Sequence, residues 1–233
     1  MKKIHSTQLN ALVNKIEEFA KNNGEKTLAD YELASDVLLC WISLLRKHCL
    51  TGVADELLTA VSSSIREAAA FAATGMVRSC LFSQRAQADL LLSWLYFKDH
   101  EIEYATLCRS GDGFVLKKEA LSYLTTHYKC FEEKLGELNR IHTRKELDCY
   151  RLLSAHIHSQ NPFVIAEVNN LEDIVRTTKL IKECIQLQSD VAEYLSDILF
   201  CTNIITLSAL PDKIKKPLHS RAKSEGQKKV LFQ

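Results

Sequence analysis

One short stretch, residues 146–159, combines an arginine with two histidines at helical spacing. Its apolar side chains recur with the period of an α-helix and predict one apolar stripe, made of Leu147, Tyr150, Leu153 and Ile157. At about 100° per residue, Arg151 and His158 lie roughly 20° apart, two turns along one flank of that stripe. His156 falls on the opposite flank. The pattern predicts that Arg151 and His158 can face one phosphate group together.

An arginine beside a histidine suits the cleavage of RNA without a metal ion. Histidine can accept the proton of a 2′-hydroxyl because its ordinary pKa, about 6.5, lies near working pH. Arginine stays charged and presents several N–H donors to the oxygens of the attacked phosphate. We therefore take Arg151 and His158 as candidate catalytic residues, with His156 as the second candidate for the histidine.

Neighbouring polar residues can support this pair. Asp148 lies one turn before Arg151 and is placed to hold its guanidinium group. Ser154 lies one turn further along the same flank, where it can bind substrate or His158. The simpler alternatives are that Asp148 and Arg151 form a surface ion pair of little energetic weight, and that a histidine at a helix end favours the C-terminal helix dipole. Both interpretations stay open on the sequence alone.

We expect no metal centre and no cofactor. The eight cysteines are scattered, without a Cys-x-x-Cys pair, and predict neither zinc nor disulfides. His100 lies in an acidic stretch, residues 99–103, but adjacent residues on a helix point in different directions and no second histidine follows at i+4. We interpret that stretch as a solvated helix junction.

The composition predicts an all-α protein. Among 233 residues there are only seven glycines and three prolines, beside many helix-forming residues. The formal net charge is +1, which gives no general attraction to nucleic acid or to a membrane. There is no signal-peptide core and no apolar run of about 18 residues, so we expect a cytoplasmic protein without a membrane segment.

Helical periodicity and capping residues place the predicted helices along the chain. Residues 22–24, Asn-Asn-Gly, should end the first helix, and Pro162 should end the helix that carries Arg151. One β-like run, residues 163–168, is too short and isolated to form a sheet. The predicted helices span about 6–21, 27–52, 53–73, 76–98, 131–141, 146–159 and 171–201, with a further helix that opens at Phe114.

The last part of the chain is polar and rich in lysine. From Pro211 onward, seven lysines and arginines outweigh two acidic residues. We expect residues 206–233 to form a flexible basic tail. Its final residues, 230–233, resemble the product end of an engineered viral-protease cleavage site, so we leave them out of the functional interpretation.

The stretch around Arg151 resembles a known family. Arg151, six intervening residues and His158 match the Arg-x4–6-His signature of HEPN-domain ribonucleases. Residues 150–158, Tyr-Arg-Leu-Leu-Ser-Ala-His-Ile-His, are similar to the YR-x-LS-x-x-V-H run of one bacterial HEPN-like group, which adds Tyr150 as a supporting residue. His156 also satisfies the spacing, but the alignment of the Leu-Ser pair favours His158.

A second stretch is similar to the same group. Residues 77–103 begin with Val-Arg-Ser-Cys and continue to Leu-Tyr-Phe-Lys-Asp-His-Glu-Ile-Glu, as a helix of that group begins with LRS and ends in LYFKDH-x-x-E. The group often has a glutamate shortly after the arginine. This chain has Leu81, Phe82 and Ser83 there, which puts the role of that carboxylate in doubt.

The resemblance implies a HEPN-like helical bundle over residues 76–205, with additional N-terminal helices from residues 1–75 packed on it. It implies that an arginine and a histidine from each of two protomers meet across a two-fold interface. They would cut RNA by attack of the 2′-hydroxyl and leave a 2′,3′-cyclic phosphate. It further implies a homodimer or larger homo-oligomer that acts as an anti-phage defence or toxin effector, with an antitoxin or defence-system protein as a further partner.

An alternative function belongs to a different class. A HEPN-like bundle without catalysis would serve as a binding or regulatory subunit of a defence or toxin–antitoxin complex. Two departures favour it: the missing acidic residue near Arg78, and Leu152 at a position where many nucleases of the family have a polar residue. A third option is a nucleotide-transfer system in which another chain holds this domain as its target or toxin.

Overall fold

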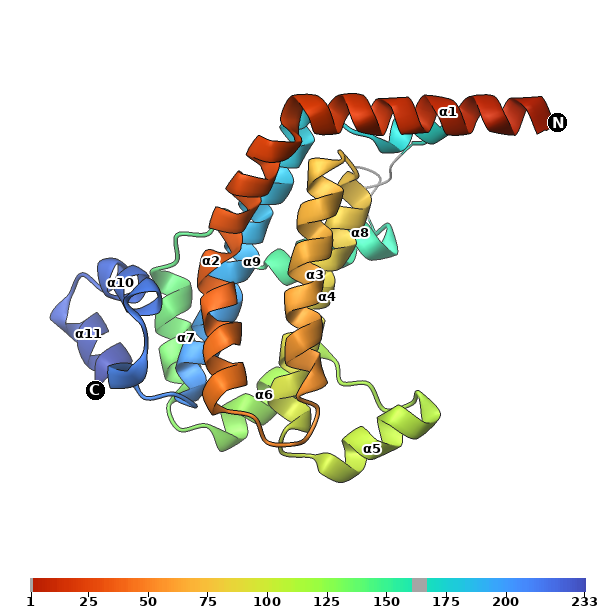
Figure 1. The fold of residues 1–233 in the computed structure, drawn as a ribbon. Helices are drawn as coiled ribbons and strands as arrows, with labels where there is room; N and C mark the ends of the chain where they lie inside the picture. Colours follow the sequence, from red (N-terminus) through yellow and green to blue (C-terminus); the bar gives the residue numbers. More distant parts are fainter. Residues whose placement is uncertain (1, 161–166) are drawn as a thin grey trace.

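A computed structural model describes residues 2–160 and 167–233, with side chains from residue 5 onward. The described residues form helices joined by turns, without a β-strand among them (Figure 1). The predicted all-α class is therefore confirmed. Most of the β-like run predicted at 163–168, and Pro162, lie outside the described residues. No helix in the described part is both long enough and apolar enough to cross a bilayer.

The elements, in chain order, are α1 (Lys2–Phe19), the π-helical turn η1 (Ala20–Gly24), α2 (Glu25–His48), α3 (Glu56–Ala73), α4 (Val77–Phe97), α5 (Glu101–Ser110), α6 (Lys117–His127), α7 (Phe131–Arg140), α8 (Cys149–His158), the 3-10 turn η3 (Leu171–Ile174), α9 (Thr178–Thr202), the 3-10 turn η4 (Leu207–Ala209), α10 (Asp212–Arg221) and α11 (Glu225–Phe232).

The core lies between α2, α3, α4 and α9. α3 packs along α4 and α2 packs along α9 (Figure 1). The largest side chains that are almost fully buried include Trp41 of α2 and Trp94 of α4. Two of these central helices, α2 and α3, come from residues 1–75. The apolar stripe of α2 meets that of α9, and the apolar stripe of α3 meets that of α4.

Buried hydrogen bonds fix how these helices face one another. The indole N–H of Trp41 on α2 donates to Ser196 on α9 at 2.9 Å. The hydroxyl of Tyr31 on α2 donates to Gln188 on α9 at 2.6 Å, and Gln188 donates to Gln87 on α4 at 2.8 Å. Because a buried polar group without a partner destabilises the fold, these bonds select one rotation of each helix.

The first helix does not end where the sequence predicted. α1 continues through η1 into α2, and α1 projects away from the bundle with η3 beside it (Figure 1). Gly24 keeps a helical φ of −59° and is buried, with the carbonyl oxygen of Ala73 3.4 Å from the place of a β-carbon. The glycine is therefore used for close packing on α3. The side-chain amide of Asn23 donates to the carbonyl of Phe19 at 3.3 Å, within the wider π-turn.

The segment 206–233 differs from the flexible tail that its composition predicted. It forms η4, α10 and α11, and the side chains of Ile214, Leu218 and Leu231 are buried. Phe232 packs its ring against His219 at 4.1 Å and against Phe200 of α9 at 6.0 Å between ring centres. A few apolar residues at helical spacing were enough to dock the segment, although lysines dominate its composition.

Candidate functional site

The helix that carries the candidate residues is α8, and local chemistry sets both of its ends. The carboxylate of Asp148 accepts a hydrogen bond from the backbone N–H of Arg151 at 3.0 Å, as an N-cap residue does. Ser159 ends the helix with a left-handed φ of 49°, and its N–H bonds to the carbonyl of Ala155. The helix is shorter than predicted because Asp148 caps it, which leaves Glu146 and Leu147 in the preceding loop.

The faces of α8 separate the candidate residues. Cys149 and Leu153 point into the core and are almost fully buried. Arg151 and His158 lie on one flank of the helix, as the helical phase predicted, and both are exposed. His156 is half-buried on a different face, beside Leu152. Leu147, predicted in the apolar stripe, is 50% exposed because it precedes the helix.

One side of α8 is fastened to α4 by polar contacts. The Nε of Arg85 on α4 donates to the hydroxyl of Ser154 at 3.1 Å, and the same guanidinium bonds to the Tyr150 hydroxyl. Arg85 also forms an ion pair with Asp89, which accepts a hydrogen bond from Tyr150 at 3.0 Å. Burial, together with the nearby Asp89 carboxylate, raises the pKa of Tyr150 to about 12. Ser154 therefore binds Arg85, whereas the sequence predicted a contact with substrate or with His158.

Asp148 also has a role that the sequence did not predict. Its carboxylate accepts a hydrogen bond from Lys117 of α6 at 2.9 Å, besides the bond from the Arg151 backbone. Burial opposes ionisation, but the bond from Lys117 and then the Arg151 amide hold the pKa of Asp148 below its ordinary value. Within the described residues the guanidinium of Arg151 lies in no ion pair, and its positive charge further lowers the pKa of Asp148. The hydrogen bond between the two residues comes from the Arg151 backbone.

His156 lies in a groove between α4, α8 and α9. The groove has a volume of about 610 Å³, and its lining combines apolar side chains with lysines and acidic residues. Burial lowers the pKa of His156, and the charge of Arg78 lowers it further. Both effects favour the neutral imidazole, which can donate one hydrogen bond and accept another.

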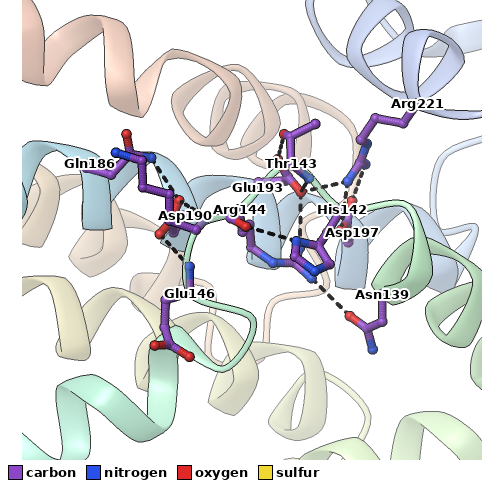
Figure 2. Close-up of polar contacts among 11 residues, drawn as sticks. Asn139, His142, Thr143, Arg144, Glu146, Gln186, Asp190, Glu193, Asp197 and Arg221 are labelled. Carbon is purple, nitrogen blue, oxygen red and sulfur yellow. Dashed lines mark hydrogen bonds and ion pairs between the residues drawn. The ribbon is translucent and has the colours of Figure 1, made fainter.

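A buried charge network anchors the loop that leads into α8. Arg144 donates to Asp197 of α9 at 2.7 Å, and Arg221 of α10 pairs with the same carboxylate (Figure 2). Glu193 accepts hydrogen bonds from the backbone N–H of Thr143 and from Arg221, both at 2.9 Å. These contacts join the loop 141–148, α9 and α10.

Asp190 continues this anchoring one turn earlier on α9. Its carboxylate accepts a hydrogen bond from the backbone N–H of Glu146 at 3.1 Å (Figure 2). It accepts a second from the backbone N–H of Lys145 at 3.2 Å. Because these amides lie just before Asp148, the start of α8 is held at a defined place over α9.

Sequence reasoning did not find Arg85, Asp89, Lys117 or Arg144. A signal was present on α4, where the charged residues Arg78, Arg85 and Asp89 recur at helical spacing. The partners of these residues are distant in sequence, so spacing alone does not reveal the contacts. Within the described residues, no three His, Cys, Asp or Glu side chains come together as metal ligands would.

The chain was compared with family models, with curated proteins and with solved structures, and no match was found in any of the three. The resemblance to HEPN ribonucleases therefore depends on the residues quoted above, and the function is argued from the site.

Proposed function

We propose that this protein is a metal-independent endoribonuclease whose catalytic pair is Arg151 and His158 on α8. The observation that carries the proposal is that both side chains lie on the exposed face of a helix whose other faces are fastened to the bundle. A fixed helix with an exposed guanidinium and an exposed imidazole is suited to bind one phosphate from solvent.

Each residue has a distinct role in this proposal. His158 takes the proton of the RNA 2′-hydroxyl, and the resulting oxygen attacks the adjacent phosphate. Arg151 stabilises the negative charge that develops on the phosphate oxygens. The products are a 2′,3′-cyclic phosphate and a strand with a free 5′-hydroxyl. His156 is the second candidate for the base, although it lies on the groove side of α8.

A second copy of the chain completes the proposed site. A flat helix face leaves the phosphate in water, and a two-fold partner would cover it and supply a second arginine–histidine pair. Apolar side chains near the start of α8 support such a contact, because Leu116 is 53% exposed and Leu147 is 50% exposed. These residues flank the two members of the Lys117–Asp148 ion pair in sequence. The proposed assembly is a homodimer or larger oligomer.

The proposed setting is the bacterial cytoplasm, where such an enzyme would act as an anti-phage defence or toxin effector held by an antitoxin or another defence protein. The alternative remains a HEPN-like regulatory subunit without catalysis. One observation favours this alternative: the Ser154 hydroxyl, which was to orient His158 or substrate, bonds to Arg85.

Cleavage of a labelled single-stranded RNA tests the proposal. Arg151→Ala and His158→Ala should each lower the cleavage rate by roughly a hundredfold or more. Arg46→Ala and His48→Ala are matched controls, because both residues are exposed in the last turn of α2. They should leave the rate unchanged, and so should EDTA. Unchanged cleavage by the folded α8 variants would refute the assignment of the catalytic pair.

A further inference from the structure

The groove beside α8 has the dimensions and lining of a ligand site. Its volume of about 610 Å³ falls within the range of small-molecule pockets. Three helices and the loop before α8 form its walls, so it is a concave surface rather than a gap between two elements. Its apolar lining consists of Val77, Leu81, Leu152, Leu180, Cys184 and Leu187.

His156 lies in this wall of the groove. The imidazole of His156 is half-buried, and neither ring nitrogen has a hydrogen-bond partner among the described residues. Since a half-buried polar group gains from a partner, the ring is available to a ligand that carries hydrogen-bonding groups on a flat apolar body. A nucleobase has that combination.

Three lysines contribute to the lining of the groove. Lys145, Lys179 and Lys182 line it and are exposed. Three acidic residues share the lining: Glu146, Glu183 and Asp190. The carboxylate of Asp190 is occupied by the backbone N–H groups of Lys145 and Glu146, and within the described part of the chain none of the three ammonium groups lies in an ion pair. Mobile lysines without fixed partners favour contacts with phosphate groups.

We propose that this groove binds one unpaired nucleotide of the RNA strand next to the cleaved phosphate. The base lies on Leu81 and Leu152, and His156 bonds to its edge. The lysines contact the flanking phosphates. Leu152 follows Arg151 directly in α8. An RNA strand that passes over the helix therefore reaches both the groove and the flank that carries Arg151 and His158. The identity of the ligand as RNA rests on the proposed function, and the binding step itself does not need cleavage.

Binding of a fluorescein-labelled, 2′-O-methylated single-stranded RNA, measured by fluorescence anisotropy, tests the inference. The methyl groups prevent cleavage, so affinity is read independently of the catalytic pair. The double variant Lys179→Glu/Lys182→Glu should weaken binding by roughly tenfold or more. His156→Ala should weaken it by roughly fivefold. Lys223→Glu/Lys229→Glu, with the same charge change on exposed residues near the C-terminus, should leave affinity nearly unchanged.

A duplex RNA competitor should displace the probe at least roughly tenfold less well than the same strand alone, because the groove requires an unpaired base. Unchanged affinity of the Lys179/Lys182 variant, or equal competition by duplex, would overturn the groove inference while cleavage through Arg151 could stand. Groove-dependent binding without any cleavage would overturn the nuclease proposal alone. No RNA binding by the wild type would overturn both.

Discussion

Arg85 of α4 and Ser154 of α8 are joined by a hydrogen bond of 3.1 Å from Nε to Oγ. The same guanidinium lies 3.5 Å from the centre of the Tyr150 ring and pairs with Asp89. One largely buried arginine therefore fixes the rotation of α8 about its axis. That rotation decides that Arg151 faces solvent and that His156 faces the groove.

Replacing Arg85 by methionine tests this relationship. Methionine keeps an apolar stem but leaves Tyr150 and Ser154 without the guanidinium, so we expect the free energy of unfolding to fall by about 1–3 kcal/mol. Urea denaturation followed by circular dichroism measures the change. Arg66→Met is the control, because Arg66 is exposed on α3 and lies in no ion pair among the described residues, so it should contribute less than about 1 kcal/mol. If the two variants lose the same free energy of unfolding, Arg85 does not stabilise the packing of α8 on α4.

The buried network predicts a larger effect at Asp197. Its carboxylate is fully buried between Arg144 and Arg221, so Asp197→Asn leaves two buried guanidinium groups with Glu193 as the remaining acid of the network. We expect a loss of about 3–5 kcal/mol in the free energy of unfolding. Asp36→Asn removes an exposed partner of Lys213 and should cost at most about 1 kcal/mol. A small effect of Asp197→Asn in urea denaturation would contradict a structural role for the network.

His156 predicts a pH dependence of stability. Burial and then the charge of Arg78 hold the pKa of His156 below its ordinary value, so the unfolded chain binds this proton more tightly than the folded chain. Neutral His156 contributes to the free energy of unfolding above the pKa of the unfolded chain, about 6.5. This contribution is lost as the pH falls through the pKa of His156 in the folded chain. Wild type should therefore lose more stability than His156→Gln between about pH 7 and pH 5. If the urea midpoints of wild type and His156→Gln change equally with pH, the lowered pKa of His156 is refuted.

Gly75 should not tolerate alanine. Its φ is +80°, and a β-carbon would lie 2.7 Å from Val175 and 3.2 Å from the ring of Phe19. We expect Gly75→Ala to lower the free energy of unfolding by about 2 kcal/mol or more, through backbone strain and overpacking. Gly113→Ala is the control, because φ there is +91° with no atom within 4 Å, so it reports strain alone. If Gly75→Ala and Gly113→Ala lower the melting temperature equally, the side chains of Val175 and Phe19 move aside at little cost, and overpacking at residue 75 is refuted.

Several sequence predictions succeeded because they depended on local chemistry. Few glycines and prolines favoured helices, and the structure is all-α. The helical phase placed Arg151 and His158 on the same flank of one helix, since that relation depends only on the turn angle between residues of that helix. That this flank faces solvent was decided by the packing of α8. The predicted end of the first helix was wrong, because Gly24 is held helical by its packing on α3.

The sequence by itself determined the all-α class and the helix that carries Arg151. It also determined that His158 lies on the same flank of that helix as Arg151. Only the tertiary structure decided that Ser154 binds Arg85 and that Asp148 binds Lys117. The physical reason is that helix phase depends on neighbours along the chain. The partner of a side chain depends on which distant helix packs against it, and that choice follows from burial of the whole core.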